Sequence, residues 1–316
     1  MLKTKIFFII LHILLGLFFS GFSVIAEESQ SINNLKAGTE TFRPDGTSCE
    51  FSAEEKKYLS ELKKRGKIII ASRIITDVYK PQPKGMAKGF NYSLASSFAE
   101  YIGVDLEVKV VSFKDYFSKD GNVPERVKTD GNFSYTPDLI NQVDMYVDTI
   151  TIIPWRQKLL RMIKIIPTRI MIITRKGEEI NELKELGDKS ISILKNSSYE
   201  VRIREIQKEL GINPKIVFAD DTPADTLLVV NGFADVSLLD ANRVIKSIGK
   251  YYNLNVSLPA SDIQYLSWAV NKNNRILSSI LEKYIASARK SGLMNRLWYD
   301  HFGITLEEYY DLLKIN

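Results

Sequence analysis

From residue 67 onward, the hydrophobic positions alternate between short runs of strand length and longer stripes with helical spacing. The apolar run over residues 170–174 is uninterrupted, which indicates a strand buried on both faces. A helical stripe that begins at Ile276 predicts an amphipathic helix. Strands are predicted over residues 68–71, 106–111, 145–151, 170–174, 190–194, 215–218, 236–239 and 265–270, and further helices over residues 93–102, 137–142, 200–210 and 225–231. This alternation predicts an α/β fold with parallel layers.

Two segments lack the alternation. Residues 27–51 are rich in Ser, Asn, Thr and Gly without periodicity, and they predict a flexible lead-in. Residues 118–135 carry Gly, Asn, Pro and charges, and they predict a long exposed loop. Directly after the lead-in, Ser52 and Glu55 have the spacing of a capping box, which predicts a helix that ends at Gly66.

The N-terminus has the pattern of an export signal. Lys3 and Lys5 precede an apolar run over residues 6–19, and the segment ends in small or compact residues before Glu27. These features predict a signal peptide over residues 1–26 that is cleaved, and hence a periplasmic protein. The alternative is an uncleaved N-terminal anchor, because residues 6–26 could nearly span a bilayer.

Composition narrows the classes of function. The chain has 316 residues, of which 45% are hydrophobic and 26% charged, so it can bury a full core. A net charge of +5, with no cluster of interleaved basic and aromatic residues, gives no indication of nucleic-acid binding. Cys49 is the one cysteine, and His301 is the one histidine outside the predicted leader. Cys–His and Ser–His nucleophilic pairs and zinc sites are therefore not expected, and we predict no metal, no cofactor and no enzymatic activity.

A candidate anion site follows the predicted strand over residues 145–151. Thr149 and Thr151 lie on the same face of this strand, and Arg156 follows five residues after Thr151. A hydroxyl, free backbone N–H groups and a guanidinium suit a carboxylate, because Arg can hold both of its oxygens. The alternative is a structural salt bridge between Arg156 and Asp144 or Asp148.

The second half of the chain supplies two further candidates. Ser197 and Ser198 lie where a predicted strand turns into a helix, and free N–H groups at a helix start bind anions. Asp240 lies at the carboxyl end of a strand, where open α/β sheets present ligand groups. The alternative in each case is that these side chains cap the helix that follows.

These motifs, in their order, resemble the type 2 periplasmic solute-binding proteins of family 3, which bind polar amino acids. The chain also resembles periplasmic sensor and transglycosylase-associated members of the superfamily. The landmarks are Gly85 and Gly89-Phe90, then Thr151 and Arg156, Lys-Asn-Ser-Ser198, Gly232 to Asp240, Trp268 to Lys272, and Phe302-Gly303. The resemblance implies two α/β lobes joined by two crossing strands. It places the first lobe at residues 52–169, the second at 170–262, the return to the first at 263–303 and a C-terminal tail at 304–316.

The resemblance also assigns roles to the candidate residues. It implies that Arg156 and Thr151 bind a ligand carboxylate and that Ser197 and Ser198 bind the same carboxylate from the second lobe. It also implies that Asp240 accepts a hydrogen bond from the ligand's amino group. Arg73 stands where relatives tend to have an acidic residue. If the Arg73 side chain enters the cleft, a ligand with a second negative charge is favoured.

The aromatic wall of the expected cleft is incomplete in this chain. Tyr79 retains one aromatic position, but Gln82 follows Pro81 where relatives have Phe. We therefore include Tyr79 among the predicted ligand-binding residues and leave the identity of the ligand open.

The predicted function is an exported, monomeric solute-binding protein that delivers an amino-acid-like carboxylate to an ABC-type inner-membrane transporter. The first alternative is a sensory module that uses the same lobe closure to regulate a membrane partner, suggested by the helix after Ser52 and by the C-terminal segment. The second is a dehydratase-like enzyme, for which Glu200 or Asp240 would have to serve as the general acid.

Overall fold

The computed structural model describes residues 50–75, 78–83, 87–221 and 223–314. The predicted signal peptide, most of the predicted lead-in, Cys49 and Gly85 lie outside the described residues. No helix in the described part of the chain combines the length and the hydrophobicity that crossing a bilayer requires.

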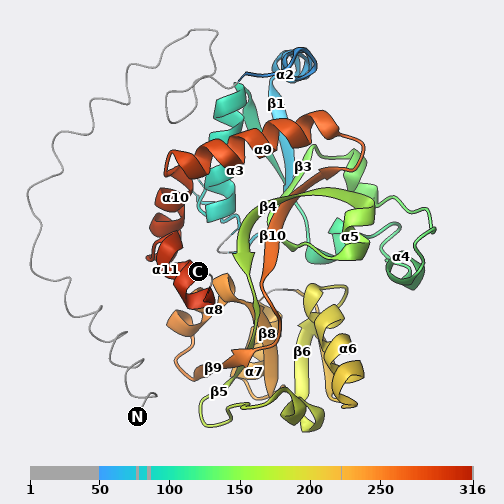
Figure 1. Cartoon of the computed structure of the whole chain (residues 1–316), viewed down its shortest axis with the longest axis vertical. Helices are drawn as coiled ribbons and strands as arrows, with labels where there is room; N and C mark the ends of the chain where they lie inside the picture. Colours follow the sequence, from blue (N-terminus) through green and yellow to red (C-terminus); the bar gives the residue numbers. More distant parts are fainter. Residues whose placement is uncertain (1–49, 76–77, 84–86, 222, 315–316) are drawn as a thin grey trace, which may run out of the picture. The chain divides into compact units, whose positions relative to one another are not determined.

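The first lobe is built on a five-stranded sheet with the order β2-β1-β3-β10-β4 (Figure 1). Its strands are β1 (Lys67–Ser72), β2 (Asp105–Val110), β3 (Met145–Thr151), β4 (Leu160–Thr168) and β10 (Gln264–Asn271). β1 pairs in parallel with β2 and β3, whereas β10 is antiparallel to β3 and β4. The parallel strands therefore place their carboxyl ends, and the residues that follow them, at one edge of the sheet.

The second lobe repeats this plan with the order β7-β6-β8-β5-β9. Its strands are β5 (Ile170–Arg175), β6 (Ser190–Leu194), β7 (Lys215–Ala219), β8 (Val236–Asp240) and β9 (Leu254–Pro259). β6 pairs in parallel with β7 and β8, and β5 lies antiparallel between β8 and β9. Ile170, Ile172 and Ile173 are fully buried, which confirms the prediction from their uninterrupted apolar run.

The chain crosses between the lobes twice. β4 of the first sheet leads directly into β5 of the second, and β9 of the second leads back into β10 of the first (Figure 1). The predicted two-lobed α/β fold with two crossing strands is confirmed.

Helices cover the faces of both sheets (Figure 1). The first lobe carries α2 (Ala53–Arg65), α3 (Phe90–Ile102), α4 (Glu125–Thr129), α5 (Pro154–Leu159), α9 (Arg275–Lys290), α10 (Leu293–Phe302) and α11 (Leu306–Leu313). The second carries α6 (Ser198–Leu210), α7 (Ala224–Val230) and α8 (Ala241–Lys250). Short 3-10 helices occur at η2 (Phe113–Tyr116), η3 (Asp138–Asn141) and η4 (Leu183–Asp188).

Helix α2 begins and ends where the sequence predicts. The Ser52 hydroxyl accepts from the Glu55 backbone N–H, the Glu55 carboxylate accepts from the Ser52 N–H, and Gly66 ends the helix at φ 78°. Glu55 is also paired with Lys283 of α9 at 2.5 Å, so the cap joins α2 to the core of the first lobe.

Helix α11, within the predicted C-terminal tail, is part of the first-lobe core. Helix α11 follows α10 after Gly303, and Tyr309 of α11 is fully buried against Trp298 of α10. The Tyr309 hydroxyl donates to the Pro167 carbonyl of β4 at 3.1 Å. The segment after Phe302 is thus anchored beside the first crossing strand.

The prediction of an exposed loop over residues 118–135 is wrong in part, because this segment contains α4 and buries Val127. The segment has apolar side chains dispersed among its polar residues, and these turn inward. Val127 thereby joins an apolar cluster with members from both lobes. We call it the inter-lobe cluster. Its buried members include Phe113, Phe117, Val127 and Trp155 of the first lobe and Leu194 and Ala219 of the second.

The α10–α11 packing predicts a large difference between two adjacent aromatic residues. Trp298 is fully buried, whereas Tyr299 is 53% exposed. We expect Trp298→Ala to lower the free energy of unfolding by about 3–5 kcal/mol through loss of buried contact and formation of a cavity. The matched control Tyr299→Ala should change it by less than about 0.5 kcal/mol. Denaturant unfolding followed by circular dichroism measures both, and equal effects would contradict the described packing.

Candidate functional site

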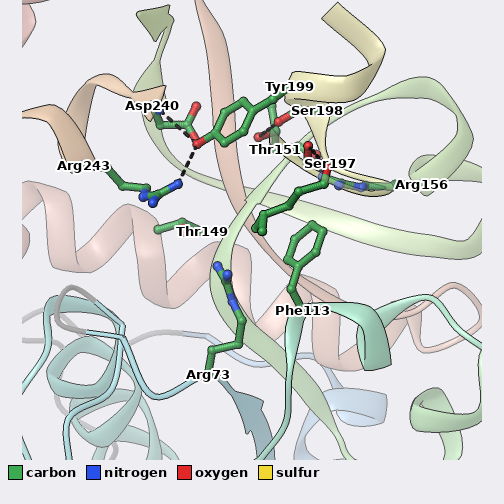
Figure 2. Close-up of a pocket in the computed structure, with 11 residues that line it drawn as sticks. Arg73, Phe113, Thr149, Thr151, Arg156, Ser197, Ser198, Tyr199, Asp240 and Arg243 are labelled. Carbon is green, nitrogen blue, oxygen red and sulfur yellow. Dashed lines mark hydrogen bonds between the residues drawn. The ribbon is translucent and has the colours of Figure 1, made fainter. Parts of the chain in front are cut away.

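A pocket between the two lobes gathers most of the predicted site residues (Figure 2). It is lined by Arg73, Phe113, Thr149, Thr151, Arg156, Leu194, Ser197, Ser198, Tyr199, Asp240 and Arg243. Of the predicted residues, Tyr79 does not line it. The Tyr79 ring packs instead against Tyr92, with ring centroids 5.3 Å apart.

Each side chain reaches the pocket from the end of a strand. Arg73 follows β1, Thr149 and Thr151 end β3, and Arg156 lies in α5, which begins three residues after the end of β3. In the second lobe, the β6–α6 turn supplies Ser197, Ser198 and Tyr199, while β8 and α8 supply Asp240 and Arg243. Both lobes therefore present residues from the carboxyl ends of parallel strands, where α/β sheets collect ligand groups.

Arg156 is a buried cation held by neutral groups. Its side chain is almost fully buried, and its Nη1 and Nη2 atoms donate to the carbonyls of Thr151 and Asn196, each at 3.0 Å. The Nε atom has no hydrogen-bond partner, and among the described residues no carboxylate lies within 4.0 Å of the guanidinium. Burial lowers the pKa of Arg156 to about 9, and the charge of Asp240 opposes this shift.

The alternative interpretation of Arg156 as a salt-bridge residue is wrong for both proposed partners. Asp144 pairs with Arg65 at 2.6 Å, and Asp148 pairs with Arg73 at 2.5 Å. The guanidinium of Arg156 lies instead over the Phe117 ring, 4.7 Å from its centroid. Its charge is thus left for a group that the described residues do not supply.

The turn before α6 presents one serine to the helix and one to the other lobe. The Ser197 hydroxyl accepts from the Glu200 N–H at 3.2 Å and donates to the Leu194 carbonyl at 2.6 Å, so Ser197 is the predicted N-cap. The Ser198 hydroxyl lies 3.0 Å from the Thr151 hydroxyl across the lobe boundary. Asn196 adopts φ 62°, a left-handed conformation that Asn accepts more readily than most residues.

Arg73 enters the cleft and is held there by a buried ion pair. Its Nε and Nη2 atoms donate to the two carboxylate oxygens of Asp148 at 2.5 and 2.9 Å, and the Tyr116 hydroxyl donates to the same carboxylate at 2.8 Å. Burial works against the charge of Asp148, but the ion pair and hydrogen bonds from Arg73 outweigh it and lower the pKa of Asp148. From the second lobe, the carboxylate of Asp221 approaches Arg73 Nη1 to 4.0 Å.

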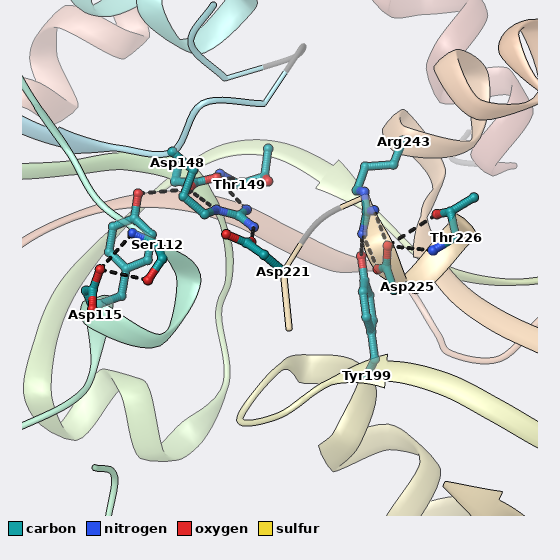
Figure 3. Close-up of polar contacts among 11 residues, drawn as sticks. Ser112, Asp115, Asp148, Thr149, Tyr199, Asp221, Asp225, Thr226 and Arg243 are labelled. Atoms are coloured by element: carbon teal, nitrogen blue, oxygen red, sulfur yellow. Dashed lines mark hydrogen bonds and ion pairs between the residues drawn. The ribbon is translucent and has the colours of Figure 1, made fainter. Parts of the chain in front are cut away.

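A matching arrangement lies in the second lobe. Arg243 donates from Nη1 and Nη2 to the two oxygens of Asp225, both at 3.1 Å (Figure 3). The Tyr199 hydroxyl donates to Asp240 Oδ2 at 2.8 Å and accepts from the Asp240 N–H at 3.0 Å. Burial, reinforced by the charge of Asp240, raises the pKa of Tyr199, so its phenol stays protonated.

Sequence reasoning missed four residues that line this pocket. Phe113 follows the strand ending at Val110, Leu194 ends β6, Tyr199 follows Ser198, and Arg243 lies in the first turn of α8 after Asp240. Each lies within three residues of a strand end or of a predicted site residue, and this nearness was the available signal.

The pocket is nearly filled by the protein. The free space among the lining side chains is about 20 Å³, room for one water molecule. Among the described residues, the contacts that hold the lobes together around it include Thr151 with Ser198, Arg156 with the Asn196 carbonyl, and Arg73 with Asp221. An amino-acid-sized ligand can enter only if these contacts separate.

The other chemical candidates lie outside this pocket. Glu200 accepts from the Asn196 N–H at 2.6 Å and pairs with Arg204, and these contacts outweigh burial and lower the pKa of Glu200. This environment does not suit a proton donor. Burial, together with the charge of Lys246, lowers the pKa of His301 to about 4, and the His301 carbonyl accepts from Lys246. No group of three or more metal-binding side chains occurs among the described residues.

The chain is similar in sequence to part of several known proteins. No family model matches the chain. It is 23% identical over 266 residues to the membrane-bound lytic murein transglycosylase F of Desulfosudis oleivorans, a match that covers 82% of this chain and 54% of that protein. The chain thus spans about half the length of the curated relatives it matches.

Solved structures confirm the expected resemblance at the level of the fold. A mutant of the arginine-binding protein ArgBP from T. maritima aligns with a TM-score of 0.62 and 20% identity, covering 78% of this chain and 99% of that chain. The solute receptor for L-cysteine of Neisseria gonorrhoeae aligns with a TM-score of 0.65 and 15% identity, covering 79% and 96%. The chain has the two-lobed fold of type 2 periplasmic binding proteins.

The buried Arg73–Asp148 pair predicts a severe effect of one small substitution. Asp148→Asn removes the buried carboxylate that forms the close ion pair with Arg73, so we expect the free energy of unfolding to fall by about 3–5 kcal/mol. Glu61→Gln removes an exposed pair with Lys64 and should cost less than about 1 kcal/mol. Urea unfolding of both variants measures the difference.

The same pair predicts a pH dependence. The folded pKa of Asp148 is lowered, so its contribution to stability is complete above about pH 4, the pKa of an unfolded aspartate. It is lost as the pH falls through the lower folded pKa. Below pH 4 the difference in stability between wild type and Asp148→Asn should therefore shrink; a constant difference would contradict an ionised pair.

Proposed function

We propose that this chain is a solute-binding module that holds an amino-acid-like carboxylate between its two lobes. The observation that carries the proposal is Arg156, a buried guanidinium at the lobe boundary whose hydrogen-bond partners among the described residues are two neutral carbonyls. Two solved structures with this fold are binding proteins named for arginine and L-cysteine, which supports a ligand of this class.

A carboxylate would satisfy Arg156 in the way that carbonyls cannot. It offers two charged acceptors to the planar guanidinium, and each charge-assisted hydrogen bond contributes about 1.5–3 kcal/mol. The hydroxyls of Thr151 and Ser198, which now contact each other, are placed to donate to the same anion once the lobes part. In this proposal Asp240, buried at the carboxyl end of β8, accepts the ligand ammonium.

Ligand binding in this arrangement is coupled to lobe closure. The groups for the carboxylate come from both lobes, so a ligand that bridges them is bound more tightly in the closed state than in the open one. The shift toward closure equals this difference in binding free energy and no more. The module is proposed to act as a monomer, exported to the periplasm by the segment over residues 1–26.

Two outputs of this closure are proposed, delivery to an ABC-type inner-membrane transporter and regulation of a membrane partner. The solved structures named as transporter substrate-binding proteins support the first. The similarity to about half of lytic transglycosylase F supports the second, because there the matching region makes up only part of a longer protein. We favour regulation, since the transglycosylases are matched at 23% and 26% sequence identity, whereas the transporter substrate-binding structures are matched at 18%.

The binding proposal predicts dependence on Arg156. Calorimetry of the purified chain against the twenty amino acids should find at least one ligand. Arg156→Gln should weaken its binding by about 100-fold or more, as expected for the loss of a buried charge-assisted pair. The control Arg296→Gln changes an exposed arginine of α10 and should leave the affinity as it is. Undiminished binding by Arg156→Gln, or no ligand for wild type, would end the proposal.

The two outputs differ in what deletion of the gene does. If the module serves transport, cells that lack it take up the labelled ligand more slowly than wild type. If it serves regulation, uptake of the ligand is unchanged, and this is the result we expect. A fall in uptake restored by the wild-type gene but not by Arg156→Gln would decide for transport.

A further inference from the structure

A second cationic region lies in the same pocket, apart from Arg156. Arg73 of the first lobe and Arg243 of the second point toward Thr149 (Figure 2). Arg156, Thr151 and Ser198 gather on the other side of the pocket in the same view. The lining thus has two regions in which a guanidinium and a hydroxyl occur together.

The carboxylates that pair with these arginines do not face the pocket. Asp148 and Asp225 are fully buried and are absent from its lining, so each lies behind its arginine. The lining side chains therefore include three guanidiniums and a single carboxylate, Asp240. A ligand in the pocket meets a surface that is cationic on balance, although the ion pairs behind it are neutral.

Both guanidiniums are held rigidly. Asp148 is fixed by Tyr116 and by the Thr149 N–H at 2.6 Å, and Asp225 by the Thr226 N–H at 2.8 Å (Figure 3). Carboxylates fixed in this way orient their arginines before any ligand arrives. A preorganised site loses little free energy to ordering when it binds.

The positive charges of the three pocket arginines repel one another, and a second anion in the pocket would reduce this repulsion. Arg243 is close enough to Arg73 to oppose its charge, and Arg73 in turn opposes the charge of Arg156. The pKa of Arg73 is affected more by burial and by its ion pair with Asp148 than by Arg243, and the pKa of Arg156 is affected more by burial than by Arg73. An anion between Arg73 and Arg243 would offset this repulsion across the lobe boundary and would favour closure.

Resting on the function proposed above, we propose that the ligand is an amino acid whose side chain ends in an anionic group. Its α-carboxylate is bound by Arg156, its ammonium by Asp240, and its side-chain anion by Arg73, Arg243 and Thr149. The Phe113 ring, whose centroid lies 5.1 Å from the Arg73 guanidinium and 5.8 Å from that of Arg156, is placed to pack on the apolar stem between the two anions. A basic amino acid would place its cation against Arg73 and Arg243 and is excluded.

The chemistry shared by the candidate ligands is a side-chain carboxylate or phosphate on an amino acid. Calorimetry of the whole chain compares an anionic amino acid with its neutral counterpart. Glutamate with glutamine and aspartate with asparagine are pairs of nearly equal shape, and O-phosphoserine with serine tests a phosphate. We expect the anionic member of at least one pair to bind about 30-fold or more tightly than its neutral partner. The pair with the largest ratio tells carboxylate from phosphate, and glutarate, which lacks the ammonium, should bind more weakly than glutamate.

Variants that remove a whole ion pair keep the fold testable. Arg73→Gln with Asp148→Asn, and Arg243→Gln with Asp225→Asn, each leave the net charge unchanged and no buried charge without a partner. Each double variant should lower the ratio of anionic to neutral affinity by about tenfold. The control Arg296→Gln should keep the wild-type ratio. Melting curves check that the variants fold, and the wild-type comparison stands without them.

The outcomes separate this inference from the function on which it rests. Neutral or basic amino acids that bind as tightly as acidic ones overturn the inference and leave the proposed function standing. Binding of no amino acid of any class overturns both. An acidic preference that both double variants retain in full also overturns the inference, because Arg73 and Arg243 would then not contact the side-chain anion.

Discussion

The burial of Arg156 without a carboxylate is the constraint on which this site depends. Removing a guanidinium from water is costly, and ordinarily a counter-ion offsets that cost. Here the guanidinium donates to two carbonyls, one from each lobe, and lies over the aromatic rings of Phe117, Trp155 and Phe113. The Arg156 guanidinium therefore has a high affinity for an anion. This affinity is high only while the two lobes are together and keep the guanidinium buried.

Closure of the lobes has an apolar component that does not involve the ligand. The inter-lobe cluster packs Phe113, Phe117 and Val127 against Leu194 and Ala219, and burial of such surface is favourable at about 25 cal/mol per Å². Opening the pocket exposes this cluster and breaks the Thr151–Ser198 contact. A ligand must offset the free energy lost from the apolar cluster and from the hydroxyl contact. Its measured affinity is therefore the free energy of its interactions with the charged groups minus these two losses.

Much of this arrangement follows from local sequence patterns. Apolar runs predicted most strands, and the spacing of Thr149, Thr151 and Arg156 placed three side chains that line the pocket. The packing of α4 could not be predicted, because Val127 is the one apolar residue of this short helix and it is buried in a cluster whose other members come from distant parts of the chain. Arg243 was missed for a similar reason: its partner Asp225 is 18 residues away, on another helix.

The central claim is that Arg156 exchanges two carbonyl partners for the carboxylate of a ligand when the lobes close on it. A crystal structure of the chain with its bound amino acid tests this directly. The account predicts a ligand carboxylate oxygen about 2.8 Å from the Arg156 guanidinium, with the Thr151 and Ser198 hydroxyls separated to receive it. A ligand bound elsewhere, with Arg156 still held by the Thr151 and Asn196 carbonyls alone, would contradict it.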